Sequence, residues 1–256
     1  MKHSMLFNTK FDFVFSLGEN CAAAHYLQRL KLREMSCPFD WLCNASIQTR
    51  STLLIDRFDG FLTRENMVLM EKPLGGDPLN DYYHDKKTGF YFFHDFSKGL
   101  AFDEAYLKVK EKYDRRIARL YKKLSVSSKV LLVWVNGEYN VDKSEFVDVI
   151  NRLKKGFPSI EFHLLVIEND MGRKKIDEQM VNANIIIFKG PFRPNPQLTW
   201  GDKSLFNLVF ARINSSVRSY LHLIRMLMYR RVKTQGKTIY YFMNFPVFWH
   251  KRKRIQ

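Results

Sequence analysis

Three unbroken apolar runs in the second half of the chain constrain its fold more than any other feature. They cover residues 130–135, 162–167 and 185–188. Runs without polar alternation are typical of strands that are buried on both faces. The segment 143–155 has helical spacing, and 173–181 is predicted as a short helix before the third run. Strands that alternate with helices predict a mostly parallel sheet, so we expect a three-layer α/β domain.

A strand, a tight turn and a helix are predicted at the start of the chain. Aromatic and β-branched residues fill 11–15, residues 16–20 have the composition of a turn, and an alanine- and leucine-rich run covers 22–30. The free N–H groups and the positive dipole end of a helix favour an anion, so a thiol in the first turn should ionise readily. Cys21 is therefore a candidate nucleophile. The alternative is a small apolar residue packed under the turn.

The middle of the chain is predicted to supply two helices, a loop and a strand. We expect helices at 46–61 and 102–124, a loop at 72–87 that is rich in proline, glycine and charge, and an aromatic strand at 88–96. His94 lies where this strand meets a loop, a position from which a side chain can reach a site. A buried histidine held by a backbone carbonyl is the alternative.

Three polar residues follow the ends of predicted strands. They are Cys21, His94 and Asn136. Ligands bind beyond the carboxyl ends of the strands in open α/β sheets. We therefore expect these side chains to converge.

Further polar candidates lie next to predicted helices. Asp40 stands between Phe39 and Trp41, and we favour an N-cap of the following helix over a chemical role for it. Arg115 and Arg116 lie off the apolar stripe of the helix at 102–124. Such arginines usually form a solvated face, although a pair of them can also hold a carboxylate or a phosphate.

The positive charge is concentrated in the last fifth of the chain. Residues 203–256 contain twelve Lys and Arg and no Asp or Glu, which gives +12 of the net +16. Apolar residues recur at helical spacing over 205–227, which predicts a basic amphipathic helix. We therefore divide the chain into an α/β catalytic domain at 1–195 and a basic extension at 196–256. An anionic membrane surface is the favoured partner of this extension, nucleic acid is less favoured, and docking onto the core is the alternative.

Cysteine usage and hydropathy favour a cytoplasmic protein. The three cysteines cannot all pair and show no CxxC spacing, which fits a reducing compartment. No apolar run reaches the length of a membrane span, and the first ten residues do not read as a secretory signal. The basic extension would attach the protein to the inner face of the membrane. Cys37 and Cys43 lack the spacing of zinc ligands, and we expect no metal ion or cofactor.

Four short motifs together resemble a bacterial family of unknown function described as papain-like cysteine peptidases. They are Ser-Leu-Gly-Glu-Asn-Cys at 16–21, Ser-Cys-Pro-Phe-Asp-Trp-Leu at 36–42, Phe-His-Asp-Phe at 93–96 and Tyr-Asp-Arg-Arg at 113–116. The resemblance covers about residues 13–167. The first motif is also similar to the opening block of esterases with an SGNH-type fold.

The resemblance implies a nucleophile and a base. It implies Cys21 as nucleophile and His94 as base, with an acidic or amide partner that orients the imidazole. Asp95 directly follows His94, and Asn136 is the other candidate for this partner. Members of the family are similar to proteins encoded among surface-polysaccharide genes, which implies a role in glycan assembly or modification.

The working hypothesis is a cysteine-dependent hydrolase or acyltransferase. Cys21 would attack a peptide or acyl carbonyl, His94 would transfer the proton, and N–H groups from Gly18 to Cys21, Asn20 included, would hold the oxyanion. A glycosyltransferase-like enzyme is the first alternative. It would use Asp40, His94, Asp95, Arg115 and Arg116 for an anionic donor, with a glycan as substrate. A non-catalytic scaffold at the membrane is the second alternative.

Overall fold

The structure is a computed structural model in which the chain forms two compact units, Met1–Val217 and Arg218–Gln256. It describes residues 9–19, 21–71, 77–136, 141–170, 172, 176–190, 209–210, 212–215, 229–234, 237–242 and 245–251. The predicted domain boundary after residue 195 lies outside these residues and stays a prediction.

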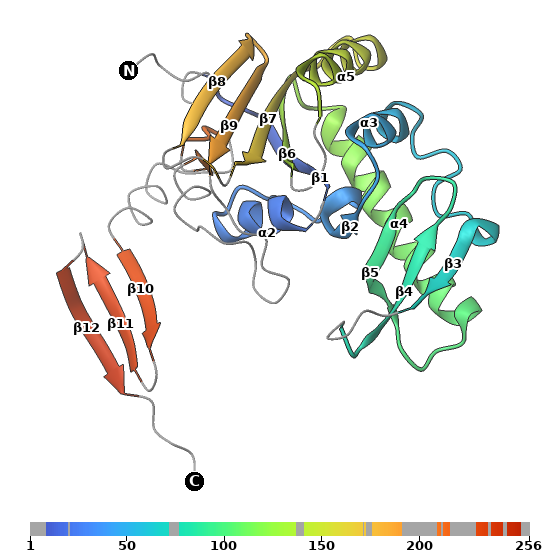
Figure 1. The fold of residues 1–256 in the computed structure, drawn as a ribbon, viewed down its shortest axis with the longest axis horizontal. Coiled ribbons are helices and arrows are strands. Elements are labelled where there is room, and N and C mark those ends of the chain that lie inside the picture. Colours follow the sequence, from blue (N-terminus) through green and yellow to red (C-terminus); the bar gives the residue numbers. More distant parts are fainter. Residues whose placement is uncertain are drawn as a thin grey trace. The chain divides into compact units, whose positions relative to one another are not determined.

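A five-stranded, largely parallel sheet organises the first unit (Figure 1). Its order is β1-β6-β7-β9-β8, in which the first four strands are parallel and β8 is antiparallel to β9. The bounds are Phe13–Gly18 for β1, Lys129–Asn136 for β6, Glu161–Asn169 for β7, Asp177–Asn182 for β8 and Ile185–Gly190 for β9. The predicted α/β class with a mostly parallel sheet is confirmed for this unit.

The helix predicted at 173–181 is wrong for its second half. Residues Asp177–Asn182 form the edge strand β8, and exposed and half-buried side chains alternate along it. An edge strand with one solvated face needs little apolar sequence, so its polar composition gave no strand signal.

Both faces of the parallel sheet are buried. Helices α4 (Phe102–Leu124) and α5 (Lys143–Gly156) share one core with alternate residues of β1, β6 and β7, such as Phe15, Leu132 and Leu164. Helix α2 (Ala22–Arg29) packs against β1 and β6 outside that core and carries buried Tyr26, whose ring lies 6.1 Å from that of Phe210. Strands that are covered by helices on both faces can be apolar throughout, and this is why the sequence predicts them.

A second sheet is antiparallel and packs against α4. Its order is β2-β5-β4-β3, with bounds Leu42–Cys43 for β2, Met67–Met70 for β3, Asn80–Asp85 for β4 and Tyr91–Ser97 for β5. The loop predicted at 72–87 is therefore wrong for 80–85, which pairs with strands on both sides. Two neighbouring tyrosines in β4 stack on rings of β5 and α4, a cross-strand signal that no local pattern contains.

Helix α3 (Ile47–Ile55) is shorter than the predicted 46–61. Ser46 caps its N-terminus by accepting a hydrogen bond from the Thr49 N–H. The helix ends because Arg57 and Phe58 adopt left-handed backbone angles with φ of 54° and 62°. The prediction that Asp40 caps this helix is wrong. It lies instead in the 3₁₀ helix η1 (Pro38–Trp41); a further 3₁₀ turn, η2 (Arg64–Asn66), precedes β3.

The second unit contains a three-stranded antiparallel sheet. Strands β10 (Tyr229–Thr234), β11 (Lys237–Phe242) and β12 (Phe245–Lys251) pair in chain order. Most of residues 205–227, where the amphipathic helix is predicted, lie outside the described residues. Among the described residues, no helix combines the length and hydropathy that a membrane crossing requires.

Candidate active site

Cys21 lies between the first parallel strand and the first helix, as predicted. β1 ends at Gly18, and both Gly18 and Glu19 have left-handed backbone angles, with φ of 80° and 88°. This reversal brings Cys21 to the N-cap of α2, where it is half-buried. Asn20 lies outside the described residues. The turn thus places a partly accessible thiol at the positive end of a helix dipole.

Arg50 supports this turn through hydrogen bonds to backbone carbonyls, a role that was not predicted from the sequence. Its side chain is fully buried, and it donates to the carbonyls of Leu17 at 2.7 Å, Leu42 at 3.0 Å and Asn44 at 2.5 Å. Burial lowers the pKa of Arg50 to about 9, which leaves it charged at neutral pH. A Cβ on Gly18 would lie 2.9 Å from the Arg50 Nη1, so only glycine fits beside the guanidinium.

The three thiols have different surroundings. Cys37 is fully buried, and burial raises its pKa. Burial, together with the neighbouring charge of Cys21, raises the pKa of Cys43 to about 12. Cys21 alone among them stands at the N-terminus of an α-helix, whereas Cys37 caps the short 3₁₀ helix η1. Neither Cys37 nor Cys43 is therefore placed to be a thiolate at neutral pH.

His94 is exposed by a bulge in β5. Phe92 pairs with Tyr83 and Phe96 with Asp81, so two steps along β4 face four steps along β5. Both phenylalanines stay buried while the His94 side chain between them is 43% exposed. The expectation that His94 follows a strand of the parallel sheet was wrong, because it lies within an antiparallel strand. Bulges of this kind re-aim side chains near active sites.

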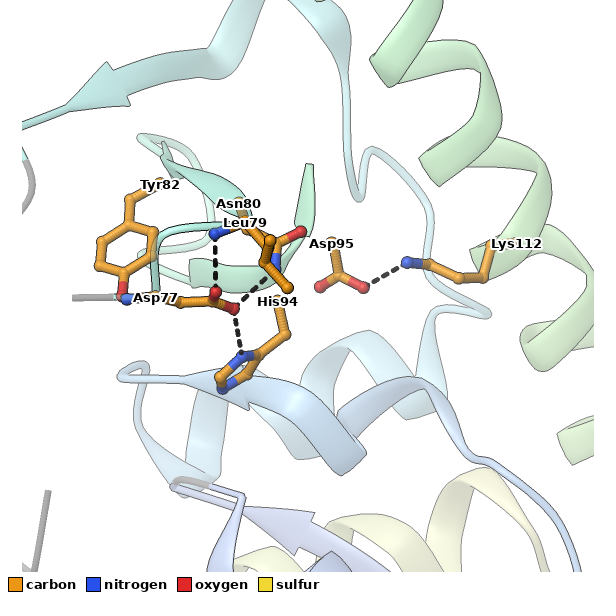
Figure 2. A network of polar contacts seen from close by, with 7 residues as sticks. All are labelled: Asp77, Leu79, Asn80, Tyr82, His94, Asp95 and Lys112. Carbon is orange, nitrogen blue, oxygen red and sulfur yellow. Dashed lines mark hydrogen bonds and ion pairs between the residues drawn. The ribbon is translucent and has the colours of Figure 1, made fainter. Parts of the chain in front are cut away.

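Asp77, and not Asp95, faces the imidazole (Figure 2). Asp77 Oδ2 lies 3.7 Å from His94 Nδ1, and the Asp77 carboxylate also accepts from the Leu79 N–H and the Asn80 side chain. These hydrogen bonds, chiefly that from Leu79, lower the pKa of Asp77, so it is a carboxylate at neutral pH. The Asp77 N–H donates to the Tyr82 hydroxyl at 2.6 Å, which anchors this end of β4.

Asp95 is turned toward α4. Its carboxylate is 2% exposed and binds Lys112 at 2.5 Å (Figure 2). It also accepts a hydrogen bond from the Tyr113 hydroxyl at 2.9 Å. Both of its partners come from the helix, so the structure places this carboxylate in an interior ion pair. The predicted orienting role of Asp95 is not supported by these contacts.

The short strand β2 joins the surroundings of Cys21 and His94. Cys43 forms a parallel bridge with Glu19 on one side and pairs with Tyr91 of β5 on the other. Just before β2, the Trp41 ring lies 6.1 Å from the His94 ring in an edge-on arrangement. The turn before Cys21 and the strand of His94 therefore border the same two-residue strand. Asn136 ends β6, the neighbour of β1, and its side chain is not described.

Asp40 and the two predicted arginines have separate roles in the fold. Asp40 is fully buried and accepts from the Cys37 N–H at 3.0 Å and the Arg33 side chain at 2.8 Å. Arg115 is exposed and pairs with Glu111 one helical turn earlier. The half-buried guanidinium of Arg116 lies 5.1 Å from the Tyr113 ring centroid. The two arginines therefore do not form a pair, and only Arg116 lies near Asp40.

Replacing Asp40 with asparagine is expected to change how stability depends on pH. Burial raises the pKa of Asp40 from 3.8 to about 6, so the folded state holds its proton more tightly than the unfolded state does. Its contribution to stability is therefore full below about pH 4 and is lost as the pH rises through 6. The free energy of unfolding of the wild type minus that of Asp40→Asn should fall by up to about 3 kcal/mol between pH 4 and pH 7.

Urea titrations at several pH values measure this difference. Asp12→Asn is the control of opposite sign. The Asp12 carboxylate accepts from Ser128 and Lys129, and these hydrogen bonds, led by the Ser128 hydroxyl, lower its pKa. The Asp12 difference should grow as the pH rises. An Asp40 difference that is flat or that grows with pH would contradict the burial argument.

Comparisons with known proteins place residues 12–172 in the family described as "Putative papain-like cysteine peptidase (DUF1796)". "Uncharacterized protein R408" of Acanthamoeba polyphaga mimivirus is 27% identical over 170 residues, which cover 59% of this chain and 75% of that protein. This relative is viral, whereas the motifs suggested a bacterial family. No solved structure matches the chain significantly. Because the matched segment exceeds half of the 256 residues and contains Cys21 and His94, the chain belongs to this family.

Proposed function

We propose that the protein is a cysteine-dependent hydrolase that acts on a peptide or acyl carbonyl, with Cys21 as its nucleophile. The observation that carries this proposal is the contrast among the three thiols. Cys21 is half-buried at the N-cap of α2, whereas burial raises the pKa of both Cys37 and Cys43. The nucleophile in such an enzyme is the thiolate, which the helix N-terminus favours.

His94 is the proposed general base. Its Nδ1 faces the Asp77 carboxylate, so this nitrogen carries the proton and Nε2 is left to accept one from the thiol. Asp77 fixes the tautomer and stabilises the imidazolium that forms, as the third member of a Cys-His-Asp arrangement. The exposed bulge gives the imidazole the freedom to close on the thiol when substrate binds.

His25 is the competing base, since it lies one helical turn after Cys21 on α2. Its ring packs edge-on against Tyr26 at 5.7 Å, and burial, with the charges of Arg29 and Arg33, lowers its pKa. A lowered pKa makes an imidazole a weaker base. Among the described side chains, no carboxylate forms an ion pair with His25 as Asp77 does with His94. We therefore assign the role to His94.

The proposed reaction has two steps that share one base. The Cys21 sulfur attacks the carbonyl carbon, and backbone N–H groups at the N-terminus of α2 stabilise the oxyanion. The tetrahedral intermediate expels the leaving group, which takes the proton from His94 Nε2. Water then attacks the thioester, gives its proton to His94, and releases the acid and the thiol.

A panel of activated esters and fluorogenic peptides tests this function. The full chain should release the reporter group. Iodoacetamide should stop this release in proportion to the alkylation of Cys21, which peptide mass mapping measures. Release that continues after Cys21 is fully alkylated would overturn the proposal.

Replacing Asp77 with asparagine is expected to lower kcat by about tenfold to a hundredfold and to change KM little. The expected loss is smaller than that for a buried triad carboxylate, because the pair is 3.7 Å apart and partly exposed. Asp77→Glu should restore part of kcat, which a purely structural role would not predict.

The matched variant for this test is Asp95→Asn. It should act mainly on stability, because asparagine offers one acceptor oxygen in place of two and removes the charge that pairs with Lys112. A larger loss of kcat in folded Asp95→Asn than in Asp77→Asn would reassign the orienting carboxylate.

A further inference from the structure

A second thiol lies against the proposed nucleophile. The backbone N–H of Cys21 donates a hydrogen bond to the sulfur of Cys43, and Glu19, two residues before Cys21, forms a parallel bridge with Cys43. The two cysteines are thus held together by backbone contacts between β2 and the turn after β1.

We propose that Cys21 and Cys43 are an oxidation site in which a reversible disulfide switches off the nucleophile; the switching, though not the disulfide itself, rests on the proposed function. Neither cysteine is part of a disulfide in the structure. The disulfide would close a loop of about twenty residues that contains η1, whose ends are already fastened by Arg50. The bridge between Glu19 and Cys43 already holds the turn before Cys21 alongside β2.

The partner thiol stays protonated while Cys21 reacts. Burial, together with the neighbouring Cys21, raises the pKa of Cys43 to about 12, so Cys43 is a neutral thiol at neutral pH. Thiolates are the form that peroxides oxidise, and the N-terminus of α2 favours the thiolate of Cys21, so the first oxidation falls on Cys21. Cys43 then attacks from a fixed position, which is the role of a resolving cysteine.

The oxidant required is a hydroperoxide, and the steps balance. The Cys21 thiolate attacks one peroxide oxygen, the S–O bond forms, the O–O bond breaks, and the departing oxygen takes a proton. Sulfur is oxidised to sulfenic acid and the peroxide is reduced. The Cys43 sulfur then attacks the Cys21 sulfur, the S–S bond forms, the S–O bond breaks, and hydroxide leaves as water with the Cys43 proton. A dithiol reverses the disulfide by exchange.

Cys37 provides the matched control. It is fully buried, and its sulfur lies 4.0 Å from the Met35 carbonyl oxygen. Its backbone N–H binds Asp40, which fixes it in the cap of η1. Burial and a raised pKa make it a slow thiol toward peroxide. Cys37→Ala should therefore oxidise as the wild type does.

The test treats the full chain with hydrogen peroxide and maps peptides without reduction. The wild type and Cys37→Ala should give a peptide pair that links Cys21 to Cys43, with loss of iodoacetamide labelling at Cys21 and at least tenfold recovery of that labelling after dithiothreitol. In Cys43→Ala, Cys21 should pass to sulfinic acid, and dithiothreitol should not restore labelling.

Two results would overturn the inference. One is irreversible oxidation of Cys21 in the wild type with no linked peptide, and the other is a linkage through Cys37. Both readouts are chemical and need no turnover, so they separate this inference from the proposed function. Absence of the link alongside an inactive Cys21→Ala would remove only the oxidation site. Presence of the link alongside a fully active Cys21→Ala would keep the disulfide and remove its regulatory meaning together with the proposed function.

Discussion

Cys21→Ala is expected to lower the turnover of an acyl substrate by on the order of 10⁴-fold or more while the protein remains folded. The thiol forms the covalent bond in the proposed mechanism, and no other described cysteine stands at the N-terminus of an α-helix to replace it. The helix should tolerate alanine, because the Cys21 side chain makes no capping hydrogen bond to the first turn of α2. Steady-state kinetics and circular dichroism on the same preparation measure both halves of the prediction.

The control for this variant is Cys37→Ala. It removes a buried sulfur from the core and should cost about 1–2 kcal/mol of stability, with kcat kept within about threefold. A Cys21→Ala protein that retains wild-type turnover would end the assignment of the nucleophile. Equal loss in both variants would point to a folding defect and would likewise count against it.

Arg50→Met is expected to produce the largest loss of stability, about 4 kcal/mol or more. The guanidinium satisfies the buried carbonyls of Leu17, Leu42 and Asn44, which methionine would leave without a donor. It also lies 4.7 Å from the ring centroid of Phe90 and 5.6 Å from that of Trp134. Among the described residues no carboxylate lies within ion-pair distance of it, so its charge is held by carbonyl dipoles and ring faces.

Arg50→Lys separates the charge from the geometry. Lysine keeps the charge but cannot reach carbonyls from both chain segments with one planar group, so we expect a loss of about 2 kcal/mol. Urea denaturation of the three proteins measures the series. Losses below about 1 kcal/mol in both variants would show that the turn before Cys21 does not depend on Arg50.

The elements that could be read from the sequence are those with a strong local pattern. α4 begins at Phe102 and ends at Leu124, as its apolar stripe predicts, and β1 with α2 places Cys21 where the turn composition predicts it. A helix with one buried face has apolar residues at helical spacing, and a strand with both faces buried has a continuous apolar run. Both patterns are visible in the sequence alone.

The elements that were missed depend on partners far away in the chain. β4 forms a strand because β3 and β5 supply its hydrogen bonds, although its sequence is polar and follows a segment with proline and glycine. β8 is a polar edge strand. Arg50 reads as a charged residue on a helix, and only the packing of η1 and β2 over it shows that it is buried.

The orienting carboxylate was missed for a similar reason. Asp77 lies seventeen residues before His94, in a stretch with loop composition, and it reaches the imidazole because β4 and β5 are adjacent. Asp95 was chosen for its place beside His94 in the sequence. The bulge in β5 sends the His94 side chain outward while Asp95 turns to Lys112.

In the proposed mechanism Cys21 forms a covalent acyl-enzyme with the help of His94. Trapping the acyl-enzyme is the direct test of this step. An activated ester would be mixed with the full chain, quenched in acid within seconds, and followed by intact mass and peptide mapping. We expect one acyl group on Cys21 in the wild type and in His25→Asn, and at least a hundredfold slower acylation in His94→Asn. An acyl group on another residue, or equal acylation rates in His94→Asn and the wild type, would contradict it.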